Sequence, residues 1–161
     1  MLWHGLSAPP GYQSIFGGVV EAIGVFAILI LLANREKIQR FATKRVTRIS
    51  LWMVTISLLC LLLYIAAYAH CVVTHPTHGS VVFPLWDSGH LKTLVFRAGG
   101  SRYAALDRYG EYAMYKAINE MPFYPFPMVA TVTLMLLSYQ GIFTALALGF
   151  GMLGLRQPDR P

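Results

Sequence analysis

The chain has 161 residues, of which 56% are hydrophobic and only 12% are charged. Soluble domains average about 25% charged residues, so an ordinary soluble domain is disfavoured. A disordered chain, which needs low hydrophobicity and high charge, is excluded. Two cysteines are too few for a disulfide-rich scaffold. The few charges are clustered, and the long uncharged stretches between them are typical of a chain that spans the bilayer.

Three segments are apolar and long enough for transmembrane helices, which need about 20 residues to cross the hydrocarbon core. We therefore expect an all-α integral membrane protein with three transmembrane helices, at residues 15–33, 49–69 and 128–155. The remaining parts are two tails, a short loop and a long loop, at residues 1–14, 156–161, 34–48 and 70–127.

The orientation follows from the distribution of lysine and arginine. The short loop 34–48 holds six basic residues, whereas the much longer loop 70–127 holds five. The positive-inside rule places the short loop and tail 156–161 in the cytoplasm, and tail 1–14 and loop 70–127 outside. Because these charges are needed for topology, they predict contact with anionic lipid headgroups and not with nucleic acid. The six residues are Arg35, Lys37, Arg40, Lys44, Arg45 and Arg48.

Glu21 is the only ionisable residue within the three predicted spans. A charged side chain deep in a membrane helix costs about 2.5–3.5 kcal/mol, so such residues usually face other helices. Gly17 and Gly24 lie on the same helical face as Glu21 and allow a second helix to come close. We favour an assembly contact through this face. The alternative is a proton or cation relay in a homo-oligomeric channel or transporter.

The long outer loop predicts three structural parts. Residues 79–97 contain two β-rich runs around a turn signal and predict a small hairpin. Residues 101–121 predict a helix with Ser101 as its N-cap. Its four tyrosines favour the outer membrane–water interface, so we expect an interfacial amphipathic helix. Three prolines exclude a regular helix between residues 121 and 127.

A group of potential metal ligands lies at the outer end of the second predicted span. Imidazole, thiolate and carboxylate groups suit zinc, copper or haem iron. The spacing matches no established metal or haem motif, and histidine is also common in polar turns and at interfaces. We therefore favour no cofactor and keep zinc, copper or haem as the alternative. The group comprises His70, Cys71, His75, His78 and His90.

Small residues recur at four-residue spacing in the third predicted span, at Gly141, Ala145 and Gly149. Such a stripe lets helix backbones approach closely, either within the chain or against another subunit. Polar residues in the middle of this span also need partners, and in a lone three-helix bundle some would face lipid. They are Ser138, Tyr139, Gln140 and Thr144.

The two cysteines are also constrained by this model of the spans. Cys60 and Cys71 are too far apart along a helix, about 16 Å, to form a disulfide with each other. Cys71 at the outer end of the span is open to pairing with another chain. We expect Cys60 to be a small apolar filler in mid-span.

These features favour a small multi-pass subunit that acts by packing inside a larger membrane protein complex. The outer loop is its expected interaction surface. We expect its membrane to be a bacterial cytoplasmic or mitochondrial inner membrane. No nucleophile or phosphate-binding motif is present, so an accessory role is favoured over an enzyme. A metal- or haem-binding redox subunit is the first alternative, and a channel or transporter that uses Glu21 is the second.

Overall fold

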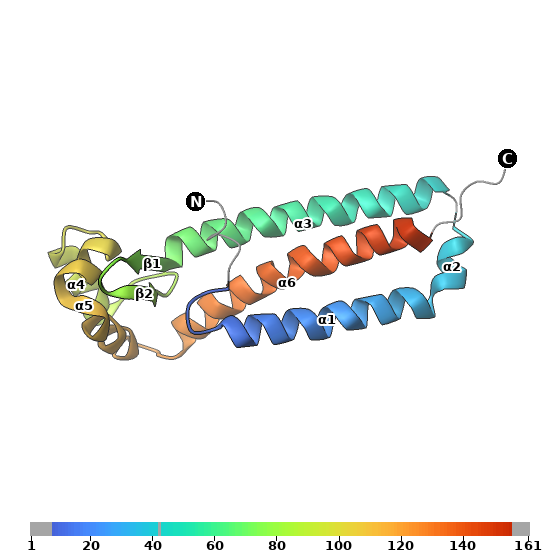
Figure 1. Ribbon diagram of the computed structural model, residues 1–161. Helices are drawn as coiled ribbons and strands as arrows, with labels where there is room; N and C mark the ends of the chain where they lie inside the picture. Colours follow the sequence, from blue (N-terminus) through green and yellow to red (C-terminus); the bar gives the residue numbers. More distant parts are fainter. Residues whose placement is uncertain (1–7, 42, 156–161) are drawn as a thin grey trace. The chain divides into compact units, whose positions relative to one another are not determined.

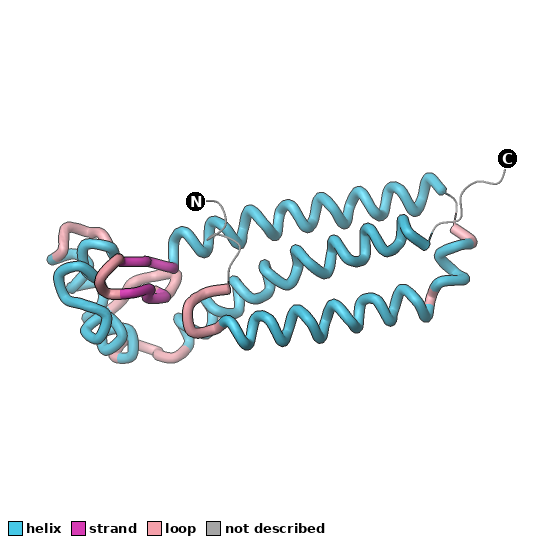
Figure 2. The backbone as a smooth tube through the Cα atoms, viewed as in Figure 1, coloured by secondary structure: helices cyan, strands magenta, loops and turns pink. Residues whose placement is uncertain are grey.

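The computed structural model describes residues 8–41 and 43–155, which are mostly helical (Figures 1 and 2). Three helices are long and apolar enough to cross a membrane, as the composition predicts: α1 (Gln13–Ala33), α3 (Thr43–Cys71) and α6 (Phe126–Leu155). The C-terminal tail 156–161 and the first seven residues of the N-terminal tail lie outside the described residues.

Most of the segment expected to be the basic loop 34–48 is helical. A short helix, α2 (Arg35–Gln39), follows α1 directly, and α3 begins at Thr43 instead of residue 49. Lysine and arginine are good helix formers, so α3 continues past its apolar part into the basic sequence. Hydropathy predicts the part of a helix that fits in lipid, and the hydrogen-bonded helix is longer.

The chain forms two compact units, each of which is described by itself. The helical unit comprises residues 14–64 and 136–155 of the described chain. The loop unit comprises residues 8–13 and 65–135.

In the helical unit, α6 packs against α3 through its small residues. A Cβ atom added at Gly141 would lie 2.6 Å from the sulfur of Cys60, and one at Gly149 would lie 3.2 Å from Cβ of Met53. Ala145, between these glycines, is buried. The predicted small-residue stripe therefore lies against a helix of the same chain.

Aromatic rings connect all three helices of this unit. The ring of Tyr139 in α6 lies 5.5 Å from Phe16 of α1 and 5.2 Å from Tyr64 of α3, between ring centroids. Phe16 and Tyr64 are completely buried. Tilted aromatic pairs at this distance add about 0.5–1.5 kcal/mol beyond the area they bury. In Figure 1, α6 accordingly lies between α1 and α3.

The loop unit contains a two-stranded antiparallel sheet, β1 (Val72–His75) and β2 (Gly79–Val82), and two helices. These helices are α4 (Gly89–Arg97) and α5 (Arg102–Asn119). A hairpin is marginal alone and needs a packing partner. Here it shares one core with both helices, formed by Val81, Phe83, Leu91, Leu94, Val95, Ala105, Leu106, Met114, Ala117, Ile118 and Met121.

The predicted hairpin at residues 79–97 is wrong, because the hairpin lies at residues 72–82 and residues 89–97 are helical. Buried Leu91, Leu94 and Val95 follow the helical spacing i, i+3 and i+4. The β-branched residues of this segment were misleading, since a short apolar run fits a strand or a helix equally well by composition.

The helix predicted at residues 101–121 is confirmed as α5, and the Ser101 side chain accepts a hydrogen bond from the Ala104 backbone N–H at 3.4 Å. Gly110, with φ 77° and ψ 168°, divides α5 into two parts. The apolar face of α5 packs into the loop-unit core. Tyrosines occupy its outward side, with Tyr112 83% exposed.

The proline-rich segment 121–127 contains no regular helix up to residue 125, as predicted, and α6 begins at Phe126. Pro127 lies in the first turn of α6, where a missing backbone N–H costs no hydrogen bond. The Thr131 hydroxyl donates to the Pro127 carbonyl at 2.8 Å and accepts from the Leu85 N–H at 2.9 Å. This links the start of α6 to the segment after β2.

Replacing Gly149 with leucine should destabilise the helical unit by about 1–3 kcal/mol, the usual cost of overpacking a tight contact. The matched control is Gly154→Leu in the same helix, where an added Cβ meets nothing within 4 Å. Unfolding in detergent, followed by helical circular dichroism, measures the difference. Equal stabilities of the two variants would show that α6 does not pack closely on α3 at this point.

Candidate functional site

The first candidate site is the face of α1 that carries Glu21. Glu21 is exposed, and it forms no hydrogen bond or ion pair with any residue that the structure describes. A Cβ atom added at Gly17 or at Gly24 would meet nothing within 4 Å. The three residues predicted as an assembly site therefore form an open face with one carboxyl group at its centre.

The four polar residues in the middle of α6 are buried or half-buried, so none of them is fully exposed toward lipid as we expected for some; Thr133, nearer the start of α6, is exposed. Ser138 and Gln140 are 3% and 8% exposed, so both point into the bundle. The Gln140 side-chain amide donates to the Thr144 hydroxyl at 3.0 Å. Glu21 is the one acidic side chain in the described parts of the three candidate spans, and it is exposed.

The second candidate site brings together two of the five predicted metal ligands. His75 ends β1, and His78 lies in the turn before β2. Their ring centroids are 5.0 Å apart. Asp107 of α5 completes the group, because Oδ1 of Asp107 lies 3.1 Å from Nε2 of His75. One donor atom from each of the three residues lies within 4.8 Å of the others.

The other three predicted ligands do not belong to this group. Nε2 of His70 donates a hydrogen bond to the Leu85 carbonyl at 3.1 Å. Cys71 is a free thiol with no exposed surface, so the expected accessibility to another chain is wrong. His90 is exposed at the start of α4. Residue 89 begins a helix and not the second strand of a hairpin. His90 therefore does not lie near the turn that holds His75 and His78.

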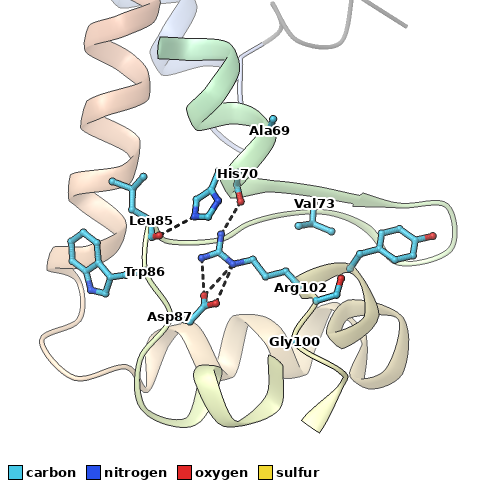
Figure 3. Close-up of a pocket in the computed structure, with 10 residues that line it drawn as sticks. Ala69, His70, Val73, Leu85, Trp86, Asp87, Gly100 and Arg102 are labelled. Carbon is cyan, nitrogen blue, oxygen red and sulfur yellow. Dashed lines mark hydrogen bonds and ion pairs between the residues drawn. The ribbon is translucent and has the colours of Figure 1, made fainter. Parts of the chain in front are cut away.

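The third feature is a largely buried junction around Arg102 (Figure 3). The guanidinium donates to both carboxylate oxygens of Asp87, at 2.8 Å to the nearer one. It also donates to the His70 carbonyl and to the Pro84 carbonyl, each at 2.8 Å. One side chain at the start of α5 therefore connects the end of α3, the segment after β2, and Asp87. Its cation also lies over the ring of Phe83, 5.4 Å from the centroid.

A cavity of about 490 Å³ adjoins this junction and is lined by His70, Trp86, Asp87 and Arg102, among others. The Nε donor, one Nη1 donor and both Nη2 donors of Arg102 are already used. Asp87 neutralises the cation. The arrangement is complete without a ligand, which indicates a structural junction and not an anion-binding site.

The six basic side chains predicted to contact lipid headgroups are all exposed. One of them, Arg48, shares a shallow groove of about 280 Å³ with Leu51, Trp52 and Thr55. Trp52 is 62% exposed. An arginine one helical turn from an exposed tryptophan is typical of a helix at the boundary between headgroups and hydrocarbon.

Two phenols of the loop unit lie in a shared polar cluster. Burial, followed by the negative charge of Glu111 and the proximity of Tyr12, raises the pKa of Tyr115 above its usual value of 10.0. Burial also raises the pKa of Tyr12, with a contribution from Tyr124. The folded loop unit thus favours the neutral form of both phenols.

Sequence reasoning missed Arg102 and Asp107. For Arg102 a signal was present, because a cation in the first turn of a helix opposes the helix dipole by about 0.3–1 kcal/mol. Such a local conflict often indicates a tertiary role. No comparable signal marks Asp107, since its contact with His75 spans 32 residues and depends on how α5 packs on the hairpin.

No protein family model, curated protein or solved structure matches this chain. The interpretation of these sites therefore depends on their own chemistry.

Replacing Arg102 with glutamine should lower the free energy of unfolding of the loop unit by about 3 kcal/mol, as expected when one partner of a largely buried ion pair is lost. Hydrogen exchange of residues 72–82 and 102–119 measures the change. Arg97→Gln is the matched control, because Arg97 is exposed and its side chain has no described partner. Unchanged exchange in Arg102→Gln would contradict a central role for the junction.

Tyr115 should ionise late in an alkaline titration. The unfolded chain ionises a phenol near pH 10, and the folded chain does so at a higher pH. This contribution to stability is therefore present below about pH 10 and is lost as the pH rises through the folded pKa. Ultraviolet absorbance should show one late phase fewer in Tyr115→Phe, whereas Tyr112→Phe should retain that phase. A titration of Tyr115→Phe with all late phases intact would refute the assignment.

Proposed function

We propose that this chain is a non-catalytic subunit of a larger membrane protein complex. It joins a neighbouring subunit through the face of α1 that carries Gly17, Glu21 and Gly24. The observation that supports this proposal is the exposed carboxyl of Glu21, which has no partner among the described residues although it lies within a helix long and apolar enough to span a membrane.

The energetic reason is the cost of leaving Glu21 in lipid. A carboxyl group facing hydrocarbon costs about 2.5–3.5 kcal/mol, and a hydrogen bond to a second helix removes part of that cost. Gly17 and Gly24 supply the space for close approach. In α6 the corresponding glycines, Gly141 and Gly149, already lie against α3 of the same chain. The glycines of α1 meet no other helix of the chain, so we infer that this face contacts a neighbouring subunit.

The exposed basic side chains of α2 and of the first turns of α3 support an orientation with this part of the chain on the cytoplasmic or matrix side. In this orientation the basic residues meet anionic lipid headgroups, and the groove at Arg48 and Trp52 lies at the headgroup boundary. The loop unit is then extracytoplasmic. We assign the protein to a bacterial cytoplasmic or mitochondrial inner membrane.

The loop unit supplies a second contact surface. An apolar groove of about 680 Å³ at the start of α6 is lined by Trp86, Phe123 and Phe126, among others. Phe123 is 88% exposed. Aromatic side chains at the start of a spanning helix favour the membrane–water interface. The outward tyrosines of α5 suit the same interface, which supports the interfacial position that we expect for this helix.

Native mass measurement in mild detergent, on protein purified from its own membranes, tests the assembly. We expect one homogeneous multi-subunit particle. Gly17→Leu should weaken it by about 3- to 30-fold in dissociation constant, because interhelical contacts contribute about 0.6–2 kcal/mol. The matched control is Ala22→Leu, which enlarges an exposed residue on another face of α1. A stable monomer of the unmodified chain would contradict the proposal.

A channel or transporter protomer is the second candidate function, and it is favoured by the isolation of Glu21 within the apolar spans. Association of identical chains through α1 would gather several Glu21 carboxyl groups at one axis. Proton or cation flux through reconstituted protein separates the two functions. Equal flux in Glu21→Gln and the unmodified protein excludes a relay, while a loss of flux favours it over simple packing.

A further inference from the structure

The end of the hairpin holds two imidazoles close together. His75 pairs with Gly79 in the sheet register, so only three residues, one of them His78, form the turn between them. Short hairpin turns of this kind are commonly followed by one residue in the left-handed region. Gly79, with φ 74°, is that residue. The turn therefore fixes His75 and His78 on one side of the hairpin end, with their ring centroids 5.0 Å apart.

Helix α5 brings carboxylates to the same place. Asp107 lies 3.1 Å from Nε2 of His75, and a Cβ atom added at Gly79 would lie 3.5 Å from Oε2 of Glu111. The break in α5 at Gly110 lies beside the turn, since a Cβ atom added there would lie 4.0 Å from Nδ1 of His78. No described lysine or arginine forms an ion pair with Asp107 or Glu111. The electrostatic environment at the hairpin end therefore favours a cation.

We propose that His75, His78 and Asp107 bind a zinc ion. Two imidazoles and a carboxylate are typical zinc ligands, with metal–ligand distances of about 2.0–2.2 Å. Their donor atoms already lie within 4.8 Å of one another. His75 is almost completely buried and holds the site in place, whereas the side chain of Asp107 is 63% exposed and free to adjust. Three protein ligands leave the fourth tetrahedral position open for water or for a residue of a partner.

Two groups of Thr77 contact Nδ1 of His75, and only the hydroxyl can accept a hydrogen bond from that nitrogen; a proton on Nδ1 deprives the Thr77 backbone N–H of its acceptor. The backbone N–H lies 3.3 Å from Nδ1 of His75 and donates to that atom when the ring proton is on Nε2. The Thr77 hydroxyl lies 2.9 Å from Nδ1 and accepts a hydrogen bond when the proton is on Nδ1. The second arrangement leaves Nε2 free to bind metal. Zinc-binding histidines nearly always donate the other ring N–H in this way.

The simpler interpretation is that the hydrogen bond between His75 and Asp107 only anchors the hairpin to α5. That interpretation accounts for His75 and Asp107 but assigns no role to His78. It also predicts that the protein has no affinity for zinc that depends on all three residues. The metal-binding proposal makes the opposite prediction, and it is independent of the assembly proposed for α1.

Zinc titration of the full chain, purified in detergent without a histidine tag, tests the proposal. We expect one zinc ion per chain by calorimetry and by metal analysis. His78→Ala and Asp107→Asn should each weaken binding at least about 100-fold, more than the 10- to 100-fold typical of losing a residue that only orients a ligand. His90→Ala is the control, because His90 is exposed and outside the group. It should bind zinc like the unmodified chain.

A pair of threonine variants separates positioning from folding. Thr77→Val removes the hydroxyl beside His75 and should weaken zinc binding about 10-fold. Thr74→Val removes another hydroxyl from the same hairpin, one that pairs with Ser80 at 2.9 Å, and should leave zinc binding unchanged. Circular dichroism checks that all variants remain folded. Absence of zinc binding by the unmodified chain, or equal binding by the unmodified chain, His78→Ala and Asp107→Asn, would overturn the proposal.

Discussion

The largely buried pair of Arg102 and Asp87 is the interaction on which the loop unit depends. A guanidinium loses several kcal/mol of hydration when it is buried, and this loss is offset only when nearly all of its N–H groups find acceptors. Here the acceptors are Asp87 and two backbone carbonyls, those of His70 and Pro84. The start of α5 must therefore lie where the end of α3 and the segment after β2 meet.

That constraint determines what lies further along α5. Asp107 follows Arg102 by five residues, or about 7.5 Å along a helix. The first part of α5 is fixed at Arg102 and packed through Leu106, so Asp107 is carried to the hairpin end and meets His75. The helix breaks at Gly110 before its second part returns to the core. A structural ion pair thus positions residues that it does not contact.

The sequence predicts the three long helices well, because length and apolar composition alone decide whether a segment fits the bilayer. It predicts α5 equally well, from an N-cap serine and a proline after the helix. The short strands β1 and β2 are harder to predict from the sequence. Val72 and Val73 follow the apolar end of α3 without any turn signal, so nothing in the local sequence marks the start of a strand there. The start of a strand there depends on pairing with β2, which is a contact between segments and not a property of either.

The candidate sites show the same difference between what local sequence predicts and what depends on contacts between distant segments. Local sequence identifies a residue that conflicts with its surroundings, such as Glu21 in an apolar helix or Arg102 in the first turn of α5. It does not show whether the conflict is resolved within the chain. The glycines of α1 and α6 form similar small-residue faces in the sequence, yet only Gly141, Gly149 and Gly151 of α6 lie against another helix of this chain. Arg102 forms an ion pair and further hydrogen bonds with residues of its own unit, whereas Glu21 has no partner among the described residues. A conflict that folding resolves contributes to the structure of the chain, and one that folding leaves open is the physical reason to expect a contact outside it.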